Sequence, residues 1–318
     1  MTQDAKIITR SNADVLIPVE YSREIIQNVP QRSKLLPLMK RLPNMSAKQR
    51  TLPVLSALPS AYFLNGDTDS KKTTNAEWDK LTITAEELAV IVPIPEAVLD
   101  DSSYDIWSEI KPQIEEAFGV AIDEAILHGT NKPVSWPAAI VGAATAANNT
   151  IEIGTNTDIA SDIIGEDGLM SLVENDGYRV NAFFADGTME AKLRDLRDKN
   201  NQLLYTPGLT SETPTSLIGR PLVYDNQGVF DATEALMIAG DFTKAVYSIR
   251  QDMTYKVLDQ AIIQNTDGSI AYNLAQQDMV ALRCVMRLGV QIANPITRKN
   301  AVNSKRYPFA VLTPSSST

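Results

Sequence analysis

The sequence predicts an elongated α+β protein, and three observations support this fold class. One helical pattern of unusual length runs from Ser103 to His128, with apolar residues at helical spacing. The stretch "VALRCVMRLGVQI" has an apolar residue at every second position, because all seven even positions from Val280 to Ile292 are apolar. This period of two is typical of a strand. Short helical and strand patterns alternate between about 160 and 242. We therefore expect a long helix lying across a long-stranded sheet, together with a separate compact α/β domain.

Composition limits the function classes. The chain has 318 residues, 44% of them hydrophobic, which suffices for a sizeable core and for two domains. Its 29 basic and 39 acidic side chains give a net charge of −10, which disfavours tight nucleic-acid binding. The single cysteine, Cys284, excludes internal disulfides and a cysteine-based zinc site within one chain. Neither a membrane-spanning run nor a secretory signal pattern occurs, so we expect a cytoplasmic protein with no membrane partner.

Residues 1–50 predict an extended arm, because they contain only a brief helical pattern, "EYSREIIQNV", and prolines at short intervals. Two strand patterns follow, "RTLPVLSAL" and "KLTITAEELAVIVPIP", separated by a long polar stretch. Together they predict a long hairpin with an irregular tip.

The long helix is expected to begin at Ser102 or Ser103 as N-cap, with Asp105 in its first turn and Gly129 just past its end. Over 103–128 it would be about 39 Å long, and Pro112 should bend it. A helix of this length exceeds the width of a small domain. We therefore expect part of it to pack against something beyond its own core.

The middle of the chain predicts small elements. Residues 131–162 are expected to form loops and short strands, "GLMSLVENDG" a short helix and "YRVNAFFAD" a buried strand. The stretch "TMEAKLRDLRDKNNQLL" predicts a helix with Met189, Leu193 and Leu196 inward. Further strands are predicted in "SLIGRPLVYDN", "ALMIAGDF", "AVYSIRQDMTYKV" and "YPFAVLTP", with a turn at Asp267-Gly268 and a disordered "SSST" end.

No residue pattern predicts catalysis. The only histidine, His128, falls at the end of the long helix, where a structural capping role is the simpler interpretation. Cys284 occupies an inward strand position and is expected to act as a small hydrophobe. Adjacent carboxylates such as Glu86-Glu87 diverge on a strand or helix, and no phosphate loop, nucleophile elbow or metalloprotease motif occurs. We expect no enzyme activity and no catalytic residue, cofactor or metal.

The order of these parts resembles the tailed-bacteriophage major capsid protein family, the Hong Kong 97-type fold, over essentially the whole chain. The phrases "PVEYSREII", "EEAFGVAIDEAILHGT" and "MVALRCVMRLGVQIANP" are the ones most similar to such proteins. The resemblance implies an N-terminal arm, an extended loop hairpin, a peripheral domain with a long spine helix (103–128) and long-stranded sheet, and an axial α/β domain. The corresponding ranges are 1–50 for the arm, 51–95 for the loop, 96–132 with 243–297 for the peripheral domain, 133–242 with 298–314 for the axial domain, and 315–318 for the tail.

The function implied by the resemblance is structural. Copies would self-assemble as hexamers and pentamers into an icosahedral phage head, formed in the host cytoplasm and kept in the virion, that encloses double-stranded DNA without binding it tightly. Many family members carry an N-terminal scaffolding segment, whereas here the arm begins within a few residues of Met1. We therefore expect that scaffolding comes from a separate protein or is not needed. A portal protein and a decoration protein are further expected partners.

The extended loop would contact a neighbouring subunit and then move during head maturation. The expected intersubunit contacts are Asp67, Asp69, Lys71, Lys72 and Trp78. The founding member of the family joins its subunits by a lysine–asparagine isopeptide bond. Lys71 and Lys72 lie near the expected tip, but no partner asparagine or glutamate aligns, and a solubilising role is the simpler interpretation.

Two alternatives stay open at this point. An encapsulin-like cellular compartment shares the fold, although the proline-broken arm favours the viral shell. A cytosolic hydrolase without a recognisable motif belongs to a different class and would be a compact monomer or small oligomer with a polar pocket.

Overall fold

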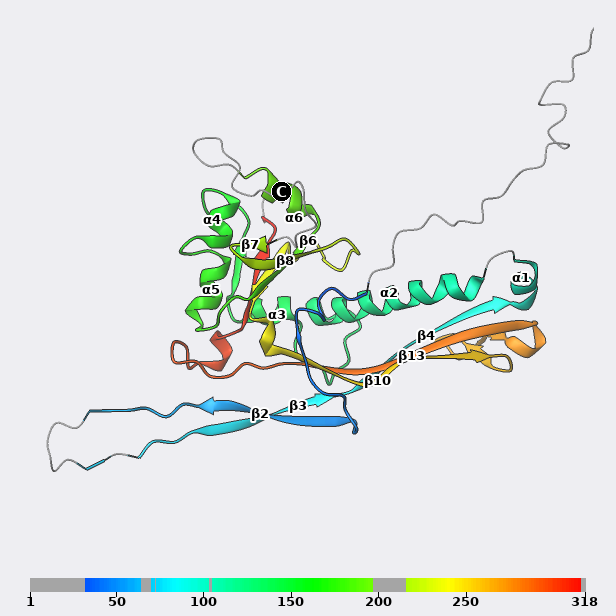
Figure 1. The fold of residues 1–318 in the computed structure, drawn as a ribbon, viewed down its shortest axis with the longest axis horizontal. Helices are drawn as coiled ribbons and strands as arrows, with labels where there is room; N and C mark the ends of the chain where they lie inside the picture. Colours follow the sequence, from blue (N-terminus) through cyan, green and yellow to red (C-terminus); the bar gives the residue numbers. More distant parts are fainter. Residues whose placement is uncertain (1–31, 64–69, 72, 103–104, 197–215, 316–318) are drawn as a thin grey trace, which may run out of the picture.

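The structure is a computed structural model that describes residues 32–63, 70–71, 73–102, 105–196 and 216–315. It is elongated, with a long helix lying along a long-stranded sheet, an α/β domain toward one end, and a hairpin that projects from the body (Figure 1). None of the helices among the described residues combines the length and apolarity needed to cross a membrane.

The long-stranded sheet has the order β1-β10-β13-β4. Its strands are β1 Lys40–Arg41, β10 Ala245–Leu258, β13 Met279–Ile292 and β4 Glu86–Pro95. Strand β13 runs antiparallel to both β10 and β4, and β1 pairs parallel with β10. The even positions of β13 from Leu282 to Ile292 are buried, so the period of two correctly identified the inward face. A small hairpin of β11 Ile262–Gln264 and β12 Ile270–Asn273 turns at Gly268, as predicted.

The long helix, α2, spans Ile106–Leu127 and is about 33 Å long at 1.5 Å per residue. Its N-cap is Asp105, whose carboxylate accepts the N–H groups of Trp107 and Ser108, so the predicted serine cap is wrong. Ser102 instead ends a short helix that was not predicted, α1 Glu96–Asp101. At the other end His128 is the C-cap and Gly129 follows at φ +80°, as the sequence predicted.

The predicted hairpin differs from the structure in its second strand. The pattern "KLTITAEELAVIVPIP" contains two strands, β3 Glu77–Thr84 and β4, which separate at the fully buried Ala85. Only β3 pairs with β2 Gln49–Ala57, whereas β4 joins the long-stranded sheet beside β13. The apolar pattern continues through Ala85, so nothing in it predicts that the pairing partner changes from β2 to β13 at this point.

The α/β domain contains a six-stranded sheet of order β5-β14-β9-β6-β8-β7. Its strands are β5 Thr150–Glu152, β14 Phe309–Thr313, β9 Met237–Gly240, β6 Ala182–Asp186, β8 Arg220–Asp225 and β7 Ser216–Leu217. Helices α4 Ile159–Ile164, α5 Leu169–Asn175 and α6 Thr188–Arg194 pack in a core with one face of the sheet. The other face shares a core with α2, α3 Ile140–Ala146 and the long-stranded sheet, so both domains are built on continuous apolar packing. Short 3-10 helices occupy Phe242–Lys244, Leu274–Gln276 and Asn303–Lys305.

Two local predictions in this domain need correction. Helix α3 lies in the alanine-rich stretch that was expected to form loops and short strands, because alanine favours helix and Ile140 and Ala144 are buried on one side. Helix α6 ends at Arg194, well before the predicted end, although Met189 and Leu193 are fully buried as expected. The helix predicted over 20–29 and residues 316–318 of the predicted tail lie outside the described residues.

Candidate assembly surface

The β2–β3 hairpin leaves the body from a buried base. Its register runs from Gln49 opposite Thr84 to Ala57 opposite Glu77. At the base, Ile83 is fully buried in a small cluster with Met45, Ala85 and Val246. The backbone of the long sheet approaches closely here: a Cβ at Gly289 would lie 2.6 Å from the Ile83 side chain and 2.7 Å from the Thr84 carbonyl oxygen. A residue without a side chain is therefore needed where the hairpin leaves the sheet.

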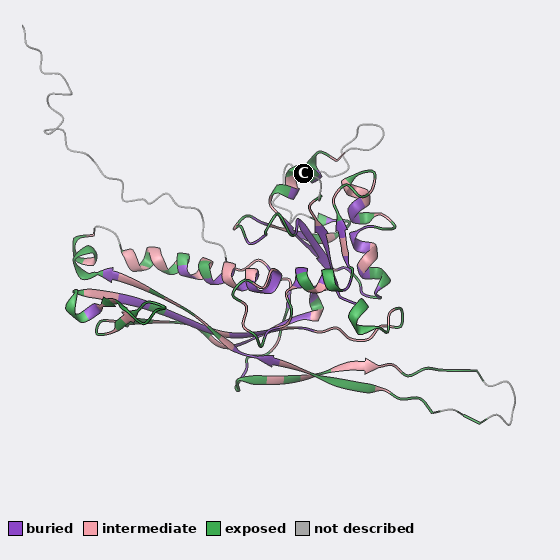
Figure 2. Ribbon diagram, turned by 180° about the vertical axis from the view of Figure 1, so that it is seen from behind, coloured by how far each residue is buried: buried purple, intermediate pink, exposed green. Residues whose placement is uncertain are grey.

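Beyond the base the hairpin has no buried core of its own. Figure 2 shows its buried residues confined to the end near the body, with intermediate and exposed residues farther out. Trp78 is 64% exposed and Phe63, toward the tip, is 99% exposed. Exposed large aromatic side chains are costly in water and are the residue types most often found at the centre of protein interfaces. The outer hairpin thus exposes two large aromatic side chains, which makes it a candidate contact surface.

The structure describes two of the five residues predicted to contact a neighbouring subunit. Trp78 lies on β3 and Lys71 in the adjoining loop, and both are exposed. Asp67, Asp69 and Lys72 lie outside the described residues. Phe63 was missed as a candidate contact, although the apolar "YFL" between a proline-containing turn and a polar loop was a signal that could have identified it.

A buried carboxylate on α2 holds the end of the arm. Asp123 is fully buried and accepts hydrogen bonds from the Ser33 hydroxyl at 2.6 Å, the Lys34 N–H at 2.9 Å and the Leu35 N–H at 3.3 Å. Burial raises the pKa of Asp123 to about 6, and the three hydrogen bonds oppose that rise. Arg32 adds an ion pair at 2.8 Å with Glu115, which lies about two turns earlier on the same helix. These contacts determine where the arm meets the body.

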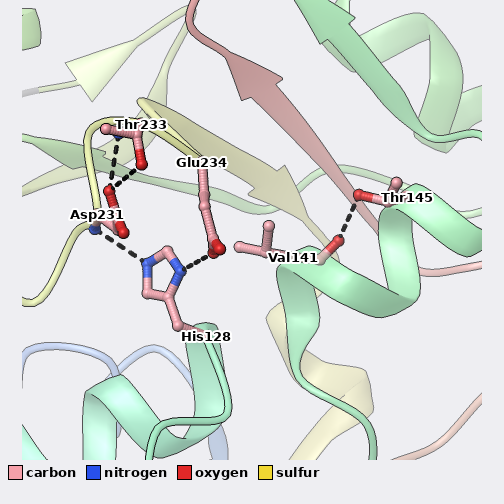
Figure 3. Close-up of polar contacts among 6 residues, drawn as sticks. All are labelled: His128, Val141, Thr145, Asp231, Thr233 and Glu234. Atoms are coloured by element: carbon pink, nitrogen blue, oxygen red, sulfur yellow. Dashed lines mark hydrogen bonds and ion pairs between the residues drawn. The ribbon is translucent and has the colours of Figure 1, made fainter.

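The end of α2 is tied to the α/β domain by the single histidine (Figure 3). His128 Nε2 accepts a hydrogen bond from the Asp231 N–H at 3.2 Å, and Nδ1 lies 2.9 Å from a Glu234 carboxylate oxygen. Because Nε2 is an acceptor, the neutral ring carries its hydrogen on Nδ1 and donates it to Glu234. Hydrogen bonds from Thr233 lower the pKa of Asp231 in the same turn. His128 is thus a structural link between the helix and the loop that precedes β9, and its side chain does not cap the helix carbonyls.

The one cysteine is a core residue of the described part of the chain. Cys284 is fully buried in β13, and burial raises the pKa of its thiol, which disfavours the nucleophilic thiolate. Within the described ranges, no three His, Cys, Asp or Glu side chains converge to hold a metal ion.

A long helix over a long-stranded sheet, a separate α/β domain and a hairpin that leaves the body together define a shell-forming subunit of the Hong Kong 97 type. A family model described as the phage capsid family matches residues 13–297, and the chain belongs to this family.

Individual relatives agree with this assignment. The chain is 30% identical over 293 residues to the major capsid protein of Staphylococcus phage 80alpha, covering 91% of this chain and 85% of the relative. A solved chain from Microbacterium phage Oxtober96 is 36% identical with a TM-score of 0.83, covering 97% of this chain and 100% of that one. A chain from Mycobacterium phage Adephagia is 29% identical with the same TM-score, 0.83, covering 98% and 99%.

Proposed function

We propose that this chain is a major capsid subunit whose copies assemble as hexamers and pentamers into the icosahedral head of a tailed phage. The observation that carries the proposal is the correspondence over whole chains, since 97% of this chain superimposes on 100% of a phage chain at a TM-score of 0.83. A match over part of the chain would support the fold of one domain, whereas this match includes the hairpin and both domains.

The hairpin supports the proposal independently of the comparisons. A two-stranded ribbon with few buried residues is at best marginally stable alone in water. Its exposed aromatics, Trp78 and Phe63, would become buried if the ribbon lay on a neighbouring copy. Each such interface can be modest, because a closed shell sums many identical contacts.

The negative net charge of the chain supports a shell that encloses double-stranded DNA without binding it tightly. A net charge of −10 opposes close approach of a phosphate backbone. Weak binding of this kind would leave the genome free to enter and to leave. Assembly in the host cytoplasm, followed by residence in the virion, completes the proposal.

The proposed division of the chain is an arm (1–50), an extended loop, a peripheral domain and an axial domain. Strand β4 pairs with β13, which favours placing 86–95 with the peripheral sheet instead of the extended loop. A separate scaffolding protein, a portal protein and a decoration protein are proposed as partners of the assembled head.

The test is to express the chain alone and together with the genes that neighbour it in a phage genome, and to examine the products by negative-stain microscopy and light scattering. Closed particles tens of nanometres across, or free hexamers and pentamers, are the expected result. A monomer under every condition would refute the proposal and return attention to the hydrolase alternative. Particles that form only around a cellular enzyme would favour the encapsulin alternative.

Denaturing electrophoresis of the same particles tests covalent joining. Because Lys71 is exposed and no partner for it aligns, we expect a single monomer band. A ladder of larger species would show that the shell is cross-linked.

A further inference from the structure

We propose that the loop 293–306 is a strut that sets the direction of the β2–β3 hairpin, and that Arg306 is the positioning residue that holds this strut in shape. The inference rests on the proposed function in one respect, because the direction of the hairpin matters only if the hairpin contacts another copy.

Arg306 is a buried cation that makes four hydrogen bonds to neutral acceptors of the strut and one to the Tyr178 side chain. The residue is only 4% exposed. Its guanidinium donates to Asn294 Oδ1 at 3.2 Å, the Asn294 carbonyl at 3.1 Å, the Asn300 carbonyl at 3.0 Å and Asn303 Oδ1 at 3.4 Å. No carboxylate of the described residues forms an ion pair with it. Burying a charge is costly unless its hydrogen bonds are made, so the loop must keep the conformation that supplies these acceptors.

The strut is firmly attached to the α/β domain through the turn that follows α5. The Thr297 hydroxyl donates to the Asp176 carbonyl at 2.6 Å, and the Asn300 amide donates to the Asp176 carboxylate at 2.7 Å. The Tyr178 hydroxyl lies 2.7 Å from both Asn294 Oδ1 and the Pro295 carbonyl. Asp176 itself is buried and also accepts the Tyr307 N–H at 2.9 Å. The strut therefore moves with the α/β domain.

From this fixed base the strut reaches the hairpin at two points. The Ile296 N–H donates to the Leu55 carbonyl at 3.1 Å, and the Arg298 guanidinium donates to the Pro59 carbonyl at 3.0 Å. Between these contacts and the base of the hairpin lies a groove lined by Val54, Leu81, Asn294 and Arg306, so side-chain packing does not fill the gap. The hairpin is thus supported at its base, around Ile83, and again at the strut.

A second support matters because the hairpin is long, so a small rotation at its base moves its outer end by a large distance. The seven steps of β3 from Thr84 to Glu77 span about 23 Å at about 3.3 Å per residue, so a rotation of about 10° at the base displaces Glu77 by about 4 Å. Interface contacts tolerate only displacements much smaller than this. Loss of the strut would therefore misplace Trp78 even though the hairpin itself stayed paired.

The experiment measures the hairpin direction directly. Nitroxide labels are placed on the exposed positions Glu77→Cys, on the hairpin, and Ala191→Cys, on α6 of the α/β domain; the native Cys284 is fully buried and excluded from labelling. The labelled chain is diluted with unlabelled chain so that only distances within one copy are measured. We expect a single narrow distance in the parent and a broadened, shifted distribution in Arg306→Lys, which keeps the charge but loses the planar fork of donors.

Two further variants keep the test decisive. Arg220→Lys changes another partly buried arginine of the same domain, one that contacts Met170 and Glu174 instead of the strut, and should leave the distance unchanged. Arg298→Ala removes one strut-to-hairpin bond on the surface; it should broaden the distribution even if Arg306→Lys fails to fold. The inference is overturned if folded Arg306→Lys gives a distance distribution as narrow as that of the parent. If Arg306→Lys does not fold, the same result in Arg298→Ala overturns it.

Shell formation is scored separately in the same variants. Fewer closed shells and a wider range of diameters for Arg306→Lys, with Arg220→Lys unchanged, would support the link between hairpin direction and assembly. If the parent chain forms no shell but the label distance still broadens in Arg306→Lys, the inference about the strut is supported and the proposed capsid function is refuted. If shells of the variant match the parent in yield and diameter, the role of the strut in assembly is refuted.

Discussion

Replacing Gly119 by alanine tests whether the arm is fixed to the long helix by close backbone contact. A Cβ at this position would lie 2.5 Å from the Ser33 nitrogen, 3.0 Å from the Arg32 carbonyl carbon and 3.2 Å from Ser33 Cα. All three are backbone atoms, so no side chain can rotate away to make room. The arm segment must move, and with it the three hydrogen bonds that Asp123 accepts.

The magnitude follows from two opposing effects. Alanine is a better helix former than glycine by about 1 kcal/mol, which favours the variant. Overpacking against a rigid neighbour costs about 1–3 kcal/mol, and weakening a hydrogen bond to a charged acceptor costs up to about 1.5–3 kcal/mol. Displacement of the arm therefore outweighs the gain in helix propensity. We expect Gly119→Ala to lower the free energy of unfolding by about 1–2 kcal/mol.

The assay is urea unfolding of the unassembled subunit, followed by hydrogen exchange at the amides of Lys34 and Leu35. Gly142→Ala is a matched control, because Gly142 also lies within a helix but a Cβ at that position would have no atom within 4 Å. The control should be stabilised by up to about 1 kcal/mol. Equal stability of the two variants, or unchanged exchange at Lys34 and Leu35 in Gly119→Ala, would refute the reasoning.

Three further predictions concern Asp123 and the hairpin. Burial raises the pKa of Asp123 from 3.8 to about 6 in the folded state, so its contribution to folding is fully present below about pH 4 and is lost as the pH rises through about 6. We expect the free energy of unfolding of the parent, compared with that of Asp123→Asn, to fall by up to about 3 kcal/mol between pH 4 and 7. A difference between the two proteins in urea unfolding that does not change with pH would contradict this. Trp78→Ala and Phe63→Ala should reduce the yield of shells in light scattering while leaving subunit stability within about 0.5 kcal/mol, and unchanged assembly would argue against their role. Deletion of 64–77 should leave a folded subunit that fails to form stable shells, and normal particles from the deletion in negative stain would show that the tip is dispensable.

The sequence was sufficient for the elements whose pattern reflects their own burial. Strand β13 is buried on the face that its period of two predicted, because alternate side chains of a strand necessarily point to opposite sides. The end of α2 at Gly129 was equally predictable, since a left-handed residue after a helix favours glycine. Membership of the phage capsid family was also evident from the order of the parts and from three short phrases.

Predictions were wrong where two interpretations of the same residues were locally equivalent. A serine and an aspartate can both cap a helix, and only the chain path selects Asp105 over Ser102. The alanine-rich stretch around α3 has weak local preference beyond helix propensity, and burial of Ile140 decides its conformation.

The candidate assembly surface was also predicted in part and missed in part. Sequence alone predicted a hairpin that includes Trp78, and the structure places Trp78 on the projecting strand β3. The sequence did not identify the switch at Ala85 from one sheet to another, since an apolar alternation is the same whichever strand is its partner.

Tertiary structure alone decided how the arm and the hairpin are held. Asp123 and Ser33 are 90 residues apart, and Arg298 and Pro59 are 239 apart, so no local pattern links them. A hydrogen bond depends on distance and direction in space, whereas hydrophobic periodicity depends on neighbours along the chain. The sequence by itself therefore determined the long helix, the inward face of β13 and the family, and only the folded chain determined which polar groups fix the arm to α2 and contact the hairpin.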